Sequence, residues 1–353
     1  MRKANVTVKD IAKMADVNAS TVSRAFNPKT EQLISKKVRE RIFAIAEKYE
    51  YEPKSSARSL VTGKSFQLGI ILHGLEADLS SPTFSKFLSE FSRESMHHNY
   101  QAVLLPVEGG TLDKEVVKNI RSSKADGYFI GASLMGMQTL EELTKRHIPV
   151  ATYISDSSLP DGLDRVTFIQ TDDSTGYAAM FKTIQERGFD SMAMFYPEQM
   201  KNHPRMTLKP IAAEYGIQVA ERIEYSSIGA PVAIWQNSYR AAKKLLPRLV
   251  KHQLIYCSSD LVALGVCDAL RETGITPGKD ISVIGYNNMA GYHNCSFSDS
   301  EFMSTIEKND RLAGKTMVQT LIGDIEAKKQ QQQKRIIKIP TTFIPRASLG
   351  FAK

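Results

Sequence analysis

The sequence contains little cysteine, and its three cysteines are not arranged for chemistry. Cys257, Cys267 and Cys295 share no spacing typical of a metal site or a redox motif, and their odd number argues against a disulfide framework. No apolar run approaches the roughly 20 residues that cross a bilayer. The first residues, MRKANVTVKDIAKM, lack the apolar core of a secretory signal. These absences predict a cytoplasmic protein with reduced thiols and no membrane contact.

Motifs of the common enzyme classes are absent as well. No G-x-G-x-x-G follows the first apolar run after residue 65, and neither a G-x-S-x-G elbow nor an H-E-x-x-H zinc motif occurs. TGKS at 62–65 is not a phosphate-binding loop, because Arg58 stands where that motif needs glycine. Asp172 and Asp173 could bind a cation, but capping of the next helix is the preferred interpretation. We therefore expect no enzymatic activity, no catalytic residues, no metal and no cofactor.

Positive charge is concentrated near the N-terminus. Residues 1–65 contain 14 Lys and Arg against seven Asp and Glu, a net charge of +7, whereas the whole chain carries +8. The remaining 288 residues are therefore almost neutral. A basic head on a neutral body is typical of a protein that binds a polyanion.

Three short helices are predicted in the basic head. Thr7 and Asp10 form a capping-box pattern before a helix over about 8–15. Asn18 can cap a second helix, and Ser35 can cap a third in which apolar residues recur at helical spacing. Three short helices around one small core predict a helix-turn-helix domain.

The start of the second helix has the composition expected of a DNA-reading surface. Ala19, Ser20 and Thr21 are small or polar, so they permit close approach to base edges in a major groove about 12 Å wide. Arg24 lies about one turn further on, where it can reach a base or a phosphate. Residues 54–65, which follow the head, predict a short helix that is unstable alone and becomes ordered against a partner.

From Phe66 onward, short apolar runs alternate with amphipathic stretches. Seven runs are typical of buried parallel strands: FQLGIIL, QAVLLPV, GYFIGA, PVATYIS, MAMFYP, LIYCSS and ISVIGY. This alternation predicts a doubly wound α/β body. Its length favours two lobes, and ligands of such folds bind at the carboxyl ends of the strands.

Several stretches resemble the lactose-repressor/galactose-repressor family of bacterial transcription regulators. VTVKDIAKMADVNASTVSRAFN is similar to its helix-turn-helix and SSARSLVTGKS to its hinge helix. YCSSDLVALGVCDALRETGITPGKDISVIGYNN resembles its effector domain, and IPTTFIPRASLG its closing strand. The resemblance covers nearly the whole chain. It implies an effector domain like the periplasmic sugar-binding proteins, with two α/β lobes joined by three crossovers.

The resemblance also assigns candidate site residues. Base-edge contacts are implied for Ala19, Ser20 and Arg24, phosphate contacts for Thr7, Ser23 and Asn27, and minor-groove contacts for Ala57 and Leu60; Thr21 completes the DNA-binding set. The implied effector-binding residues are Phe84, Arg205, Trp235 and Asp260. Asp260 can also serve as a simple helix cap, and a surface salt bridge is the alternative for Arg205. Asn287 and Asn288 stand where the family commonly has acids.

The expected domains are a helix-turn-helix head (1–53), a hinge (54–65) and an effector-binding and dimerisation body (66–353). The first lobe is expected over about 66–165 and 295–325, and the second over about 166–290 and 330–353. We expect a homodimeric, ligand-responsive repressor that binds a pseudo-palindromic DNA operator and a small sugar or sugar derivative. The alternatives are a sugar-binding protein without a DNA-linked role and a sugar-modifying enzyme, for which no catalytic constellation is present.

Overall fold

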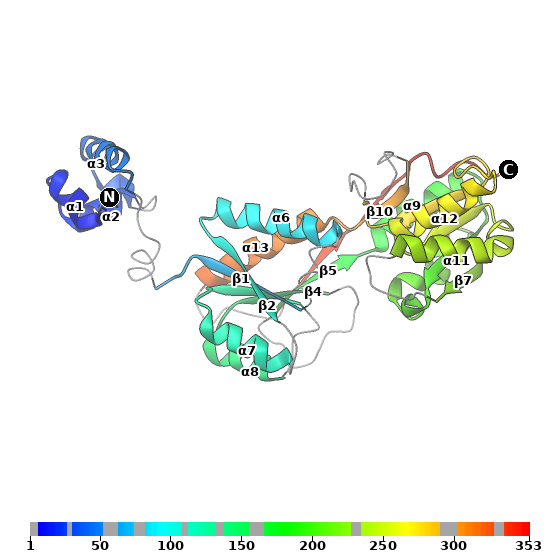
Figure 1. Cartoon of the computed structure of the whole chain (residues 1–353), viewed down its shortest axis with the longest axis horizontal. Helices are drawn as coiled ribbons and strands as arrows, with labels where there is room; N and C mark the ends of the chain where they lie inside the picture. Colours follow the sequence, from blue (N-terminus) through cyan, green and yellow to red (C-terminus); the bar gives the residue numbers. More distant parts are fainter. Residues whose placement is uncertain are drawn as a thin grey trace. The chain divides into compact units, whose positions relative to one another are not determined.

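The computed structural model describes residues 6–26, 30–51, 63–73, 82–107, 112–131, 137–154, 166–226, 234–289, 302–327 and 335–353 (Figure 1). The chain divides into two compact units, Met1–Phe66 and Gln67–Lys353. Among the helices of the described ranges, none combines the length and the apolar character that a bilayer requires.

The first unit contains the three predicted helices. Its elements are α1 (Val8–Met14), α2 (Ala19–Ala25), the 3-10 turn η1 (Glu31–Leu33) and α3 (Lys36–Lys48). The predicted capping box is confirmed at α1, where the Asp10 amide donates to Thr7 Oγ1 and the Thr7 amide donates to Asp10 Oδ2. Ile11, Val22 and Ile42, one from each helix, are fully buried and form the centre of the core. The head therefore has a hydrophobic core of its own.

The second unit begins with an all-parallel sheet. Its strand order is β11-β5-β4-β3-β1-β2. The strands are β1 (Gln67–His73), β2 (Gln101–Val107), β3 (Gly127–Ile130), β4 (Val150–Ile154), β5 (Val166–Asp172) and β11 (Arg335–Pro340). Figure 1 shows α6 (Pro82–His97) and α13 (Asp310–Glu326) on one face of this sheet, and α7 (Leu112–Ser122) and α8 (Met137–Arg146) on the other.

A second sheet forms the other lobe. Its order is β12-β10-β9-β8-β6-β7, and only the β10–β12 pair is antiparallel. The strands are β6 (Ser191–Pro197), β7 (Gln218–Tyr225), β8 (Leu254–Cys257), β9 (Ser282–Tyr286), β10 (Ser304–Glu307) and β12 (Thr342–Ile344). The helices are α9 (Ser174–Glu186), α10 (Lys209–Glu214), α11 (Ile234–Leu249) and α12 (Asp260–Glu272).

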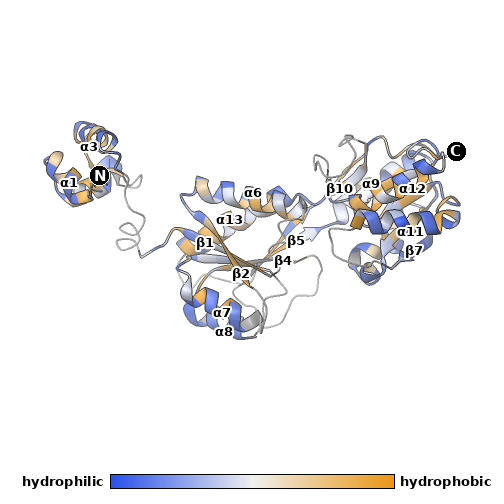
Figure 2. Cartoon of the chain, viewed as in Figure 1, coloured by the Kyte–Doolittle hydropathy of each residue, from blue (hydrophilic) through white to orange (hydrophobic). Residues whose placement is uncertain are grey.

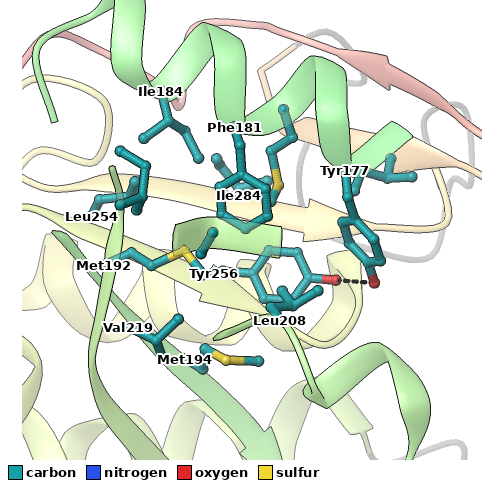
Figure 3. Close-up of a cluster of buried hydrophobic side chains, with 14 of the residues drawn as sticks. Tyr177, Phe181, Ile184, Met192, Met194, Leu208, Val219, Leu254, Tyr256 and Ile284 are labelled. Atoms are coloured by element: carbon teal, nitrogen blue, oxygen red, sulfur yellow. Dashed lines mark hydrogen bonds between the residues drawn. The ribbon is translucent and has the colours of Figure 1, made fainter. Parts of the chain in front are cut away.

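Apolar side chains gather between the helices and the sheets. Figure 2 shows apolar colouring along the strands and a polar outer surface on α7 and α8. In the second lobe, Tyr177, Phe181 and Ile184 of α9 pack onto strand residues that include Met192 and Tyr256 (Figure 3). This doubly wound arrangement confirms the predicted α/β fold.

The chain passes between the lobes three times: from β5 to α9, from β10 to α13, and from β11 to β12. The lobe boundaries expected from the sequence differ from this arrangement by one strand at each crossing. β5 and β11 pair along their whole lengths within the first sheet, while β10 pairs with β9 in the second. Each crossing therefore begins directly after a strand that belongs to the sheet of the lobe which the chain is leaving.

The three crossings are bonded to one another. The Thr341 amide donates to the Asp172 carbonyl over 3.0 Å, and the Asn309 side-chain amide donates to the Pro340 carbonyl over 2.5 Å. Thr175 Oγ1 donates to the Thr341 carbonyl. These bonds connect the segments on which any relative movement of the lobes depends.

Candidate DNA-binding surface and effector site

The exposed face of α2 carries three of the residues predicted to contact DNA. Ser20, Ser23 and Arg24 are exposed, and their spacing of three and four residues places them on one side of the helix. Val22 and Ala25 are buried on the opposite side. The helix therefore presents small hydroxyl side chains and one guanidinium to the solvent.

Ala19 and Thr21 lie at the edges of this face. Both are half-buried, and Ala19 packs against the core of the head. The loop after α2 is held to the helix, because Thr30 Oγ1 donates to the Arg24 carbonyl over 3.3 Å. η1 is held to α3 by an ion pair between Glu31 and Arg39 at 3.0 Å. The segment from Thr30 to Leu33 therefore has defined structure beside the end of α2.

Thr7 is exposed at the start of α1, but its polar atoms are engaged locally. Its hydroxyl and amide both donate to Asp10 Oδ2, over 2.7 and 2.8 Å. These hydrogen bonds lower the pKa of Asp10, which keeps a negative charge beside Thr7. The phosphate contact proposed for Thr7 stays a prediction. Asn27, Ala57 and Leu60 lie outside the described residues.

Asp260 lies at the carboxyl end of β8 and is the first residue of α12. It is only 4% exposed. Its oxygens accept hydrogen bonds from Thr305 Oγ1 and from the Met289 amide, both at 2.6 Å. Burial raises the pKa of this carboxyl to about 7, against the opposing effect of these bonds. Ser259, not Asp260, makes the capping bond of the helix, to the amide of Val262.

Arg205 lies after β6 in the same lobe. Its guanidinium stacks over the ring of Tyr286, with 4.5 Å between the guanidinium carbon and the ring centroid. The hydroxyl of Tyr286 donates to Asp173 Oδ1 over 2.5 Å. Since Asp173 stands at the first crossing, between β5 and α9, this bond joins the strand ends of both lobes. The surface salt bridge considered for Arg205 is not found among the described residues.

A second cation lies at the next crossing. The Lys308 ammonium is 5.1 Å from the ring centroid of Tyr153, which belongs to β4 of the first lobe. It is also 3.6 Å from a carboxylate oxygen of Asp310. Burial acts to lower the pKa of Lys308, but Tyr153 and Asp310 raise it above its ordinary value, so the ammonium stays charged.

The other two predicted effector residues occupy different surroundings. Phe84 lies in the first turn of α6, where its ring stacks on Phe87 with 5.8 Å between centroids. Trp235 lies at the start of α11, and its indole N–H donates to Asp268 of α12 over 2.8 Å. This bond directs Trp235 toward the contact between the two helices. We therefore leave Trp235 out of the proposed effector site.

Strand ends of the two lobes meet near Arg205 and Asp260, in a region called here the lobe junction. Four of its members were not among the effector residues predicted from the sequence: Tyr153, Asp173, Tyr286 and Lys308. Asp173 was expected to cap α9, yet within the described structure its side chain makes no capping bond and accepts from Tyr286 instead. Each of the four lies at or just after the end of a strand. A search for aromatic and charged residues at every strand end would have found them.

The described residues contain no group of three or more His, Cys, Asp or Glu side chains placed to hold a metal ion. A groove lies between α7 and α8, lined by four cationic side chains (Lys114, Lys118, Arg121 and Lys145) and by the buried Glu142. None of the predicted site residues lines it. The lobe junction, where strand ends, aromatic rings and buried charges meet, is thus the better candidate for an effector site.

Comparison with known proteins agrees with both halves of this geometry. Residues 7–54 match the family model described as bacterial regulatory proteins, lacI family, and residues 181–349 match a periplasmic binding protein-like domain. The head therefore matches the lacI family of bacterial regulatory proteins, and much of the body matches a periplasmic binding protein-like domain. The relatives that extend over both parts are DNA-binding transcription regulators and not enzymes.

Individual lacI-family relatives are distant but extend over the whole chain. The HTH-type transcriptional regulator AglR of Rhizobium meliloti (strain 1021) is 24% identical over 98% of this chain and 94% of its own. The lac repressor dimer bound to operator and the anti-inducer ONPF shares the fold, with a TM-score of 0.68 and 20% identity over 98% of this chain and 99% of its own. A CelR–cellobiose complex has a TM-score of 0.63 and 17% identity over 97% and 99%.

Proposed function

We propose that this chain represses transcription by binding operator DNA through its head, and that a small sugar-like effector bound at the lobe junction changes its affinity for the operator. The observation that carries this proposal is the exposed face of α2, with Ser20, Ser23 and Arg24, in a separate unit that matches the lacI family. A helix that presents such residues beside its own small core is suited to the major groove.

The head provides the electrostatic part of binding. The net charge of +7 on residues 1–65, the head and hinge together, attracts phosphates, and Arg24 can donate two hydrogen bonds to a guanine. The similar lac repressor structure contains a dimer on its operator. A homodimer of this chain would place two copies of α2 on the half-sites of a pseudo-palindrome. DNA contacts by Ala57 and Leu60 of the linker belong to the same proposal, and a regulator of this kind works in the cytoplasm.

The lobe junction has the composition of a sugar site. Aromatic rings such as Tyr153 and Tyr286 can cover a sugar ring, while Arg205 and Asp260 offer a donor and an acceptor. The similar CelR structure contains cellobiose. Asp260 accepts one hydrogen bond from its own chain at each oxygen, so a sugar hydroxyl that reaches it either shares an oxygen with one of these donors or displaces it.

Effector and operator must be linked through the conformation of the chain, and the hydrogen bonds among the three crossings supply the connection between the lobes.

Selection of genomic fragments on the immobilised protein, followed by a gel shift, tests the DNA part of the proposal. We expect one or a few palindromic fragments to bind far more tightly than random DNA. A chain that binds sugars but does not discriminate between DNA sequences would instead be a sugar-binding protein without a DNA-linked role.

A further inference from the structure

The lobe junction contains a connected group of buried or half-buried charges. Its cations are Lys86, Arg205, Lys308 and Arg346, and its buried carboxyls are Asp173, Asp260 and Asp310, with Asp172 and Glu307 beside them. The members interact electrostatically as one network. Lys308 and Lys86 both attract the charge of Asp310, and Lys86 and Arg346 both attract that of Asp260. Both lobes and two of the crossings contribute to this network.

Two of the four cations donate hydrogen bonds to acceptors of the same chain. Lys86 Nζ donates to the Asn288 carbonyl, which connects α6 of the first lobe with the end of β9 in the second. Arg346 donates to Asn288 Oδ1 over 2.9 Å and to the Met303 carbonyl over 2.8 Å. These two side chains hold the turn after β9 in place.

The other two cations are less completely paired. Lys308 has Asp310 at 3.6 Å, which is a loose ion pair. Arg205 has the Tyr286 ring beneath it, but among the described residues its guanidinium has neither a hydrogen-bond acceptor nor a carboxylate within ion-pair distance. A half-buried guanidinium with five donors is costly to leave without acceptors, so Arg205 is placed for a partner from outside the chain.

Burial disfavours the ionised forms of the three buried carboxyls in this group. Burial raises the pKa of Asp260 to about 7 and also raises those of Asp173 and Asp310. The pKa values of Arg205 and Lys308 lie above their ordinary values despite burial, because tyrosines and carboxylates surround them. Arg205 and Lys308 therefore stay positively charged at neutral pH, beside carboxyls whose ionised forms burial disfavours.

We propose that the effector is an anionic sugar derivative whose carboxylate or phosphate binds Arg205 and Lys308. This inference rests on the proposed function, because it names the class of ligand for that same site. A carboxylate or phosphate can accept two parallel hydrogen bonds from the guanidinium, and the ammonium adds a point charge beside it. A neutral sugar would leave the Arg205 guanidinium without a charged partner.

Inorganic phosphate is the first probe, since it requires no knowledge of the sugar. The thermal unfolding midpoint of the full chain is measured in potassium phosphate and in potassium chloride at matched ionic strength and pH. We expect phosphate to raise the midpoint of the wild type by several degrees more than that of Lys308→Gln. Lys308→Arg should restore the response, and Lys182→Gln, an exposed lysine on α9, should behave like the wild type. Equal phosphate responses in all four proteins would overturn the proposal.

Matched sugar pairs test the selectivity directly. Calorimetric titration compares glucose with gluconate, glucuronate and glucose 6-phosphate, and ribose with ribose 5-phosphate. We expect at least one anionic member to bind the wild type about tenfold or more tightly than its neutral parent, and to lose that advantage in Lys308→Gln. Tighter binding of the neutral parents, or a preference that survives the substitution, would overturn the inference.

Operator binding separates this inference from the proposed function. If a neutral sugar changes operator affinity and its anionic counterpart does not, the chain is a regulator and only the ligand class proposed above is wrong. If the chain does not discriminate operator from random DNA, the proposed function fails, whatever the phosphate and sugar titrations show.

Discussion

Replacing Asp260 by asparagine should make the second lobe more stable above neutral pH. Asp260 is buried, and burial raises the pKa of its carboxyl from 3.8 to about 7. The folded protein therefore keeps this proton at pH values where the unfolded chain has released it. Since the unfolded state binds fewer protons between about pH 4 and 7, this group makes the free energy of unfolding fall as the pH rises through that window.

The size of the effect follows from the shift. A difference of about three pKa units at about 1.4 kcal/mol each gives about 4 kcal/mol of lost stability above pH 7. Asparagine resembles the protonated acid, since its oxygen can accept from the Met289 amide and its nitrogen can donate to Thr305 Oγ1. At pH 4 to 5, Asp260→Asn should therefore differ from the wild type by only about 1 kcal/mol. As the pH rises from 5 to 8, the variant should become more stable than the wild type.

Trp235 provides the assay, because it is the only tryptophan and lies on α11, which packs against α12 in the lobe of Asp260. Urea unfolding followed by its fluorescence between pH 4.5 and 8.5 gives the free energy of unfolding for both proteins. Asp280→Asn is the control, because hydrogen bonds from the Thr276 amide and Lys353 lower the pKa of that exposed carboxyl, so its effect has the opposite sign. Parallel pH curves for the wild type and Asp260→Asn would refute the reasoning.

Three further substitutions test the DNA-binding half of the protein. Arg24→Ala should cost about 1–3 kcal/mol of operator affinity and relax specificity; fluorescence anisotropy with operator and random DNA checks this, and unchanged discrimination removes Arg24 from the recognition surface. Ile42→Ala should destabilise the head by about 2–5 kcal/mol, since Ile42 is fully buried; circular dichroism and DNA binding should then both show a loss, while effector affinity persists. Leu60→Ala should reduce operator affinity and DNA bending if Leu60 enters between base steps; wild-type bending in a gel-based assay would leave the linker as a simple tether.

The fold could be predicted where the sequence pattern is determined by burial. The capping box at Thr7 and the seven apolar runs each correspond to an observed element, because both patterns are local. β7, with the sequence QVAERIEY, escaped notice because an edge strand is half exposed and mixes charged with apolar residues. β5 and β10 were not recognised as strands, and the lobe boundaries were displaced accordingly.

The effector site was less predictable, because it is assembled from segments far apart in the chain. Asp260 and Arg205 could be named from their resemblance to a known pattern, but their surroundings could not. Neither the stacking of Arg205 on Tyr286 nor the approach of Lys308 to Tyr153 has a signature in sequence spacing. The indole bond to Asp268 likewise depends on how α11 and α12 pack, which the lone tryptophan in the sequence does not reveal.

The most direct test of the account is the coupling between the two sites. Operator affinity is measured by anisotropy without and with saturating effector, and effector affinity by calorimetry without and with saturating operator. If the head and the lobe junction are linked through one set of conformations, both affinities must change by the same factor, and that factor must differ from one. A factor of one in both titrations, with tight binding of each ligand, would contradict the conclusion that the chain is a ligand-responsive regulator.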